Sequence, residues 1–351
     1  MKKRWDIFCK VVDNFGDIGV CWRLAKQLTQ EHGLQVRLFV DDLQVASKII
    51  PTINFNKISQ LIDNIEIINF TSEVNPADVV IEAFACGLPA AYQNTMSEST
   101  IWVNLEYLSA EKWVADFHNR HSKVGNLTRL FFFPGFTENA GGLIRECDLI
   151  VRRDAFLSSH TQSEDLKISL FCYENAPLQA LFNALASGTK HATVYVPLTD
   201  SIQNIAPFFD KKNLQVGDVL IKNKLTLRVL PFLSQVKYDE LLWRCDINFV
   251  RGEDSWVRAI WAGKPFIWQP YVQTEDAHIT KLTAFLEVFY AENESACEAH
   301  GYWSSGQWSS EIWQQYLDNL PAISALTSAK SHVLANQTDL ATELVEFCIN
   351  A

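Results

Sequence analysis

The sequence lacks the paired cysteines that mark a structural metal site or a disulfide framework. Its eight cysteines are scattered, with no C-x-x-C pair and no cluster of cysteine with histidine. This spacing argues against the common zinc sites and against disulfide-rich secreted scaffolds. We therefore expect a reduced, cytoplasmic protein that binds no metal.

The chain also lacks a basic stripe and a long apolar run. Of its 351 residues, 30 are lysine or arginine and 41 are aspartate or glutamate, which gives a net charge of −11. Such a protein has no surface suited to the phosphate backbone of a nucleic acid. No apolar stretch reaches membrane-spanning length, and the basic start is not followed by the apolar core of a signal peptide. We expect a soluble protein with neither nucleic acid nor membrane as a partner.

The length and the 48% hydrophobic content suit two folded domains. Apolar runs alternate with helical stretches, which predicts two parallel, doubly wound sheets. The main predicted strands are residues 7–12, 36–40, 65–68, 79–84, 101–105, 168–171, 192–196, 225–230, 248–250 and 266–268. We expect a first domain over residues 1–152 and a second over 153–330. A last helical segment, residues 331–351, is expected to pack back on the first domain, with one helix over 331–348.

The most informative stretch covers residues 248–268 and reads NFVRGEDSWVRAIWAGKPFIW. A short strand is broken by an Arg-Gly pair, and Glu253, Asp254 and Ser255 then supply side chains typical of a helix start. A Gly-Lys-Pro sequence ends the helix before the next strand. A helix that begins in such a turn presents backbone N–H groups and a positive end, which suit a diphosphate. The alternative is that Glu253 and Asp254 only favour the helix dipole, as acids do at many helix starts.

The turn after the first strand lacks the glycine pattern that NAD and FAD proteins carry there. It reads VDNFGDIG, with Asp13 and Asp17 on either side of Gly16. Because two carboxylates repel a pyrophosphate, this turn argues against a nicotinamide-dependent dehydrogenase. The acids suit a cationic group, or one that loses a proton, at the carboxyl ends of the strands. The alternative is that Asp17 caps the helix and Asp13 forms the turn.

Two motifs carry a more specific resemblance. They are VDNFGDIGVCWRLA near the N-terminus and NFVRGEDSWVRA-x-WAGKPF-x-W in the second half. Together they resemble the EarP family, the bacterial dTDP-rhamnose-dependent protein-arginine rhamnosyltransferases that modify one arginine of translation elongation factor P. The resemblance spans nearly the whole chain. It implies an α/β protein of GT-B type, with two Rossmann-like domains facing each other across a cleft. It further implies dTDP-β-L-rhamnose as the donor, elongation factor P as the partner, an inverting transfer and no cofactor.

The resemblance also assigns roles to particular residues. Asp13 and Asp17 match the acidic pair that faces the acceptor arginine, and one of them acts as the base. Glu253 matches a residue that contacts the donor or the catalytic centre, while Asp254 and Ser255 hold the diphosphate through backbone and hydroxyl groups. The residues expected to bind the substrates are Asn14, Phe15, Gly16, Tyr195, Phe249, Glu253, Asp254, Ser255 and Gln269.

Four of these residues have a structural alternative. Tyr195, Phe249 and Gln269 lie at predicted strand ends and are expected to flank the thymine and deoxyribose of the donor. Aromatic residues of strands more often belong to the core. Phe15 either lines the sugar pocket or packs under the first turn.

Two other functions stay open from the sequence. The first is a GT-B glycosyltransferase with a small-molecule, sugar or lipid acceptor, although the sequence shows no basic amphipathic face for a lipid surface. The second is a non-catalytic two-domain protein that closes on a sugar. Such a protein has no need of an acid pair in its first turn.

Overall fold

The chain forms two compact units. The computed structural model describes residues 4–12, 15–70, 74–159 and 165–350. Unit 1 comprises Met1–Cys147 with Ala335–Ala351, and unit 2 comprises Asp148–Leu334. The predicted boundary at residue 152 falls inside helix α5 (Leu149–Ser158), which belongs wholly to unit 2. The first crossing between the units therefore lies before that helix.

Unit 1 is built on a sheet whose described strands follow the order β3-β4-β2-β1-β5-β6-β8-β7. The inner strands, from β4 to β8, run parallel, and an antiparallel hairpin closes each edge. The strands are β1 (Arg4–Cys9), β2 (Gln35–Val40), β3 (Ser59–Ile62), β4 (Ile65–Asn69), β5 (Val79–Ala83), β6 (Ile101–Leu105), β7 (His121–Val124) and β8 (Leu127–Phe132). The helices are α1 (Gly16–Gln30), α2 (Leu43–Ile49), α3 (Ala90–Gln93), α4 (Val114–Phe117) and α14 (Leu340–Asn350).

Unit 2 repeats this design with a sheet in the order β11-β12-β10-β9-β13-β14, in which only β11 is antiparallel to its neighbour among the described strands. The strands are β9 (Leu166–Leu170), β10 (Ala192–Pro197), β11 (Val219–Lys222), β12 (Leu225–Leu230), β13 (Ile247–Arg251) and β14 (Phe266–Gln269). Its longer helices are α5, α6 (Leu178–Ser187), α8 (Gln235–Arg244), α9 (Asp254–Ala262), α10 (Ala277–Phe289), α11 (Glu294–Ser304), α12 (Ser310–Asp318) and α13 (Leu320–Ala335). Short turns of helix are α7 (Asp200–Gln203), η1 (Ala206–Phe209) and η2 (Thr274–Asp276).

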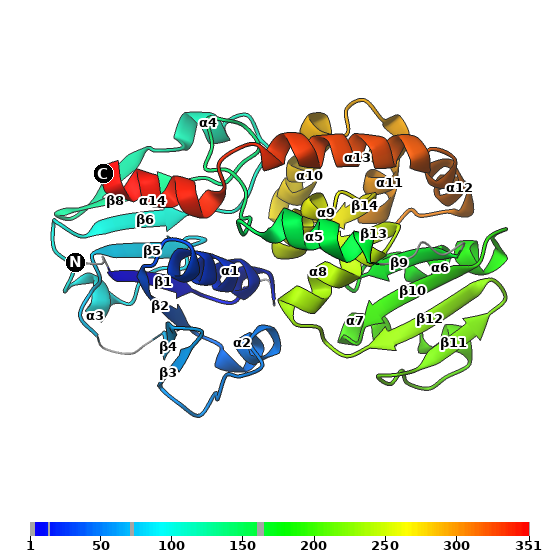
Figure 1. The fold of residues 1–351 in the computed structure, drawn as a ribbon, viewed down its shortest axis with the longest axis horizontal. Coiled ribbons are helices and arrows are strands. Elements are labelled where there is room, and N and C mark those ends of the chain that lie inside the picture. Colours follow the sequence, from blue (N-terminus) through cyan, green and yellow to red (C-terminus); the bar gives the residue numbers. More distant parts are fainter. Residues whose placement is uncertain (1–3, 13–14, 71–73, 160–164, 351) are drawn as a thin grey trace. The chain divides into compact units, whose positions relative to one another are not determined.

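The C-terminal segment forms two helices, α13 and α14, where the sequence predicts one helix over residues 331–348. Asp339 begins α14, because its carboxylate accepts hydrogen bonds from two backbone N–H groups of that helix. Arg145 donates to two carbonyl groups at and just beyond the end of α13. This break depends on side-chain capping, so it leaves no glycine or proline signal in the sequence. Figure 1 shows α14 along the sheet of unit 1, where the Phe347 ring lies 5.6 Å from that of Phe132.

Strand β1, which leads into the acidic first turn, is anchored by a buried charge. Arg37 on β2 donates two hydrogen bonds to the Asp6 carboxylate, at 2.7 and 2.6 Å, and the Tyr92 hydroxyl donates a third. Removing one partner of such a buried pair would leave an uncompensated charge, which is strongly destabilising. The pair therefore keeps β1 in register with β2 and fixes where the first turn begins.

The core of unit 2 encloses a histidine among aromatic rings. The His300 ring lies 5.2 Å from that of Tyr290, and its Nδ1 is 2.8 Å from the carbonyl oxygen of Ala296. Burial lowers the pKa of His300 to about 4, from an ordinary value of 6.5. The imidazole is therefore neutral in the folded protein at neutral pH.

Acidification should destabilise the fold through this residue. Between the two pKa values, His300 is protonated in the unfolded chain but stays neutral in the folded protein. From the two pKa values, the free energy of unfolding should fall by about 2 kcal/mol between about pH 7.5 and about pH 5. Urea unfolding at both pH values measures the loss. His300→Gln cannot ionise and should show a pH dependence smaller by this amount. An equal pH dependence in the variant would contradict the assignment.

Candidate active site

The acidic first turn of unit 1 follows β1, a central strand of the sheet. Asp17 lies in the first turn of α1, and its side chain is buried. Its Oδ2 accepts a hydrogen bond from the Val12 N–H at 2.8 Å, and its Oδ1 accepts one from the Tyr107 hydroxyl at 3.1 Å. With a donor on each oxygen, the carboxylate is held in one orientation.

Of the other residues predicted at this turn, the structure describes two and leaves two undescribed. Asp13 and Asn14 lie outside the described residues. Phe15 is the N-cap residue of α1, Gly16 is the first residue of the helix, and both are half-buried. The turn therefore brings Phe15 and Gly16 next to Asp17, as the motif predicts, while their contacts with a substrate stay predictions.

In unit 2, a tight turn leads from β13 into α9. Gly252 has a φ of 61°, a left-handed conformation that glycine adopts without strain. Glu253 is the N-cap residue of the nine-residue helix, and its carbonyl oxygen accepts the N–H of Val257 at 3.1 Å. The side chains of Glu253 and Asp254 are half-buried. This is the predicted geometry of a strand, a glycine turn and a helix start, which can receive an anion on its backbone N–H groups.

The Ser255 hydroxyl bonds to the backbone of its own turn, which is not the role that the sequence predicts for it. It accepts a hydrogen bond from the Arg251 N–H at 3.0 Å and donates one to the Arg251 carbonyl oxygen. The tight turn brings the backbone of Arg251 within reach of this side chain, which is buried. The hydroxyl therefore closes the turn, whereas the sequence predicts that it binds a diphosphate.

Two buried contacts hold α9 behind this turn. Arg258 pairs with Asp239 of α8 through hydrogen bonds of 2.9 and 2.7 Å, and the two side chains are 1% and 2% exposed. The Trp256 ring stacks on that of Trp268 in β14, with centroids 3.7 Å apart. Trp268 Nε1 also donates to the Gly252 carbonyl at 2.8 Å. The helix start is thus fixed relative to β13 and β14 by buried groups.

Arg251 and the loop after β9 form a second part of this site that the sequence did not indicate. The guanidinium lies over the rings of Phe171 and Tyr173, 4.4 and 4.6 Å from their centroids, and donates to the Cys172 carbonyl at 3.3 Å. Burial raises the pKa of the Cys172 thiol to about 12, so the thiol stays neutral although the guanidinium is near. The one signal in the sequence was the position of Arg251 directly before the Gly-Glu-Asp motif.

Gln269 is joined to the same loop. It ends β14 and is buried, with its Oε1 accepting the Tyr173 N–H at 2.9 Å and its Nε2 donating to the Asn175 Oδ1 at 2.9 Å. The oxygen and the nitrogen of its side-chain amide therefore both bond to the loop whose aromatic rings lie under Arg251. The structure gives Gln269 a supporting place in the site, and a direct contact with the nucleotide stays a prediction.

Phe249 and Tyr195 lie on β13 and β10. The Phe249 carbonyl accepts the Phe171 N–H at 3.0 Å, so its backbone adjoins the loop under Arg251. Phe249 is fully buried, and its ring centroid lies 4.5 Å from that of Trp303 and 6.0 Å from that of Trp308. A ring enclosed by tryptophans is a core residue, so the predicted contact of Phe249 with thymine does not fit this structure. Tyr195 is half-buried on β10 and lies opposite Ser169 of β9 in the register.

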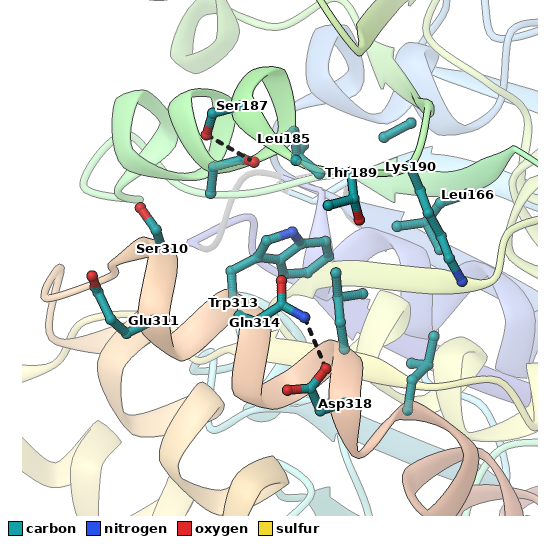
Figure 2. A pocket seen from close by; sticks show the side chains of 15 residues that line it. Leu166, Leu185, Ser187, Thr189, Lys190, Ser310, Glu311, Trp313, Gln314 and Asp318 are labelled. Atoms are coloured by element: carbon teal, nitrogen blue, oxygen red, sulfur yellow. Dashed lines mark hydrogen bonds between the residues drawn. The ribbon is translucent and has the colours of Figure 1, made fainter.

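A separate cavity of about 470 Å³ lies in unit 2, as Figure 2 shows. Its lining comes from the end of α6, the starts of β9 and β10, and α12, with Trp313 and Lys190 among the side chains. Leu166 and Ala192, which also line it, are the first residues of their strands. Because open parallel sheets bind ligands at the carboxyl ends of their strands, this cavity at the amino ends is not the expected nucleotide site.

No helix in the described part of the chain is long and apolar enough to cross a membrane. Among the same described residues, no three His, Cys, Asp or Glu side chains converge as the ligands of a metal ion would.

Solved structures identify the class of protein. The spinosyn rhamnosyltransferase SpnG aligns with a TM-score of 0.54 and 12% identity, over 98% of this chain and 99% of its own. A structure described as the basis for EarP-mediated arginine glycosylation of translation elongation factor EF-P aligns with a TM-score of 0.68 and 35% identity, over 100% of both chains. With its two sheets of mainly parallel strands, the chain is a glycosyltransferase of the GT-B fold. The predicted α/β fold class is confirmed.

Sequence comparison gives the family. The family model described as "Elongation-Factor P (EF-P) rhamnosyltransferase EarP" matches residues 5–349. The protein-arginine rhamnosyltransferase of Pseudomonas putida is 42% identical, over 100% of both chains. The chain therefore belongs to the EarP family, as the two motifs indicated.

Replacing Arg251 should weaken nucleotide binding in unit 2. Arg251→Met keeps an apolar side chain over the rings of Phe171 and Tyr173 but removes the positive charge that an anion at the helix start would meet. We expect the Kd for thymidine diphosphate, measured by calorimetry, to rise roughly tenfold, which is about 1.4 kcal/mol. Arg244→Met, which alters an exposed arginine at the end of α8, is the matched control and should bind normally. Equal affinity in both variants would remove Arg251 from the site.

Proposed function

We propose that this protein transfers L-rhamnose from dTDP-β-L-rhamnose to one arginine side chain of translation elongation factor P. Membership of the EarP family, described as an elongation-factor P rhamnosyltransferase, supports the rhamnosyl group and the acceptor. The dTDP carrier follows from the resemblance of the two motifs. The observation that carries the proposal is Asp17, a carboxylate held by two hydrogen bonds at the start of α1. A fixed carboxylate suits a guanidinium acceptor, and a translation factor as acceptor places the reaction in the cytoplasm.

The acceptor chemistry explains why carboxylates are needed in unit 1. A guanidinium is protonated at neutral pH and has no free lone pair for attack. A carboxylate can grip its planar fork, favour one nitrogen and accept a proton as the C–N bond forms. Asp17 and Asp13 fill this role in the proposal, with one of them as the base. The bond from the anomeric carbon to the diphosphate breaks as the nitrogen attacks from the opposite face, which inverts the anomeric carbon.

The donor diphosphate is assigned to the start of α9 in unit 2. Backbone N–H groups at the helix N-terminus stabilise the leaving dTDP, and Arg251 adds a positive charge, so no metal ion is required. Because the Ser255 hydroxyl is bonded within the turn, the backbone of residues 253–255 supplies the contacts. The half-buried Glu253 carboxylate is then left to contact the sugar or the reacting centre.

Removing either acid of the first turn should stop the chemistry and spare donor binding. Asp17→Asn and Asp13→Asn should each lower kcat by more than about 10²-fold, since each variant loses a carboxylate that grips the acceptor or takes its proton. Thymidine diphosphate should bind both variants with the affinity of the parent. Asp63→Asn is the control, because Asp63 is an exposed turn residue of the same unit with a φ of 52°, which asparagine tolerates. Parent-like turnover by both variants would remove the pair from the mechanism.

The acceptor is tested by incubating the protein with dTDP-rhamnose and folded elongation factor P in EDTA. We expect one deoxyhexose on the arginine-bearing loop, located by mass spectrometry. A factor whose target arginine is replaced by lysine should stay unmodified, because lysine lacks the planar fork that carboxylates grip. A short unstructured arginine peptide should react poorly, since recognition extends over the folded partner.

Other outcomes of this experiment separate the alternatives. Transfer to a lipid, free sugar or small molecule but never to the protein would identify a different GT-B glycosyltransferase. Sugar binding without any transfer would identify a non-catalytic binding protein. Equal labelling of lysine would contradict the guanidinium-specific role of the acids, and activity restored only by magnesium or manganese would contradict the metal-free donor site.

A further inference from the structure

We propose that Tyr107 is a positioning residue for the transfer, because it orients the Asp17 carboxylate and is itself held by a strained turn at Phe84. The inference rests on the proposed function, in which Asp17 acts on the acceptor. It adds two residues that neither motif contains. The three residues come from segments that follow β1, β5 and β6, which are neighbours in the sheet of unit 1.

The Tyr107 hydroxyl bonds to only one of the two Asp17 carboxylate oxygens, Oδ1. The Val12 N–H already occupies Oδ2, and the Tyr107 hydroxyl donates to Oδ1 at 3.1 Å. Without the hydroxyl, Oδ1 would lose this donor, and the carboxylate would be held less firmly about its χ2 bond, which is a broad torsion for aspartate. The hydroxyl therefore sets the angle at which the carboxylate meets a guanidinium.

The ring of Tyr107 stacks on that of Phe84. The two rings are nearly parallel, with an interplanar angle of 11° and centroids 4.3 Å apart. Both side chains are only half-buried, so the stack stands at the rim of the sheet and not in the core. A half-buried ring has room to turn, and the stack restricts that freedom.

The backbone that presents Phe84 is strained. Phe84 and Ala85 have φ values of 58° and 50°, so two successive residues with a Cβ adopt the left-handed conformation. Such strain persists only where surrounding groups impose it, and it is concentrated at functional sites. Here the Phe84 N–H donates to the Leu105 carbonyl at 2.6 Å, and the Ala85 N–H donates to the Asn104 Oδ1 at 3.1 Å. Both acceptors lie at the end of β6, the strand that leads directly to Tyr107, so one strand end positions both rings.

A packing role and a positioning role predict different kinetics. If the stack serves only stability, the hydroxyl of a half-exposed Tyr107 is dispensable and Tyr107→Phe is silent. If the hydroxyl orients Asp17, its loss slows the chemical step without changing the donor site, which lies in the other unit. Misorientation of a reacting group typically costs a large factor in rate, because the reactive geometry is narrow.

The test compares Tyr107→Phe, which keeps the stack, with Phe84→Leu, which keeps the hydroxyl but loses the stack. For Tyr107→Phe we expect kcat for elongation factor P to fall about 10- to 100-fold. Its KM for dTDP-rhamnose and its Tm should stay unchanged. Phe84→Leu should lower kcat by a smaller factor, again with an unchanged KM for the donor. Tyr302→Phe, which removes a hydroxyl from unit 2, is the matched control and should be as fast as the parent.

Three other outcomes would contradict either the positioning role of Tyr107 or the proposed function. A kcat equal to that of the parent in Tyr107→Phe, with the parent active on elongation factor P, would overturn this inference and leave the proposed function standing. A fall in kcat that is matched by a lower Tm or a higher KM for the donor would assign Tyr107 to packing and would also overturn it. If the parent protein transfers nothing to elongation factor P, the proposed function fails first and this inference falls with it.

Discussion

The buried ion pair between Arg258 and Asp239 fixes the start of α9, the helix to which we assign the donor diphosphate. Both side chains are almost completely buried, so losing either partner would leave an unpaired charge at a cost of about 3–5 kcal/mol. The pair ties α9 to α8, and the stack of Trp256 on Trp268 ties the same helix to β14. Backbone N–H groups can stabilise a leaving diphosphate only if they are already in place, and these contacts keep them there.

In unit 1, a buried ion pair likewise fixes the segment before a helix start, but this helix start carries a negatively charged side chain. The buried contact of Asp6 with Arg37 holds β1 in the sheet, and the first turn after β1 presents the oriented carboxylate of Asp17. One unit thus offers a carboxylate after a strand, and the other offers a helix N-terminus with Arg251 after a strand. In the proposed function, the carboxylate of unit 1 serves the cationic acceptor. The helix start and Arg251 of unit 2 serve the anionic donor.

Patterns along the chain predicted the architecture well, because buried parallel strands and amphipathic helices each leave a local signal. The strand, glycine turn and helix at residues 247–262 were predicted nearly to the residue, since Gly252 before the helix and Gly263 after it are local features. The break before α14 was missed, because Asp339 and Arg145 make it with side-chain hydrogen bonds and no glycine or proline takes part. The Asp339 cap is local, but the contacts of Arg145 with the end of α13 join residues far apart in the sequence.

The sequence predicted where some site residues lie in the fold, while their contacts with substrates stay predictions. Asp17 and Glu253 stand where the motifs indicated, but Phe249 proved to be enclosed by tryptophans that follow it by more than fifty positions. The Ser255 hydroxyl is occupied by its own turn, a local hydrogen bond that composition cannot reveal. Arg251 and Tyr107 were not singled out from the sequence, because their partners lie far along the chain. Arg251 lies over two rings of the loop after β9, and Tyr107 donates to Asp17 in α1.

The structure of this protein with thymidine diphosphate bound would test the proposed donor site most directly. We predict that the diphosphate oxygens lie within hydrogen-bond distance of the backbone N–H groups of residues 253–255, with the Arg251 guanidinium beside them. A diphosphate held elsewhere, such as in the acidic first turn of unit 1 or in the cavity beside Trp313, would contradict it.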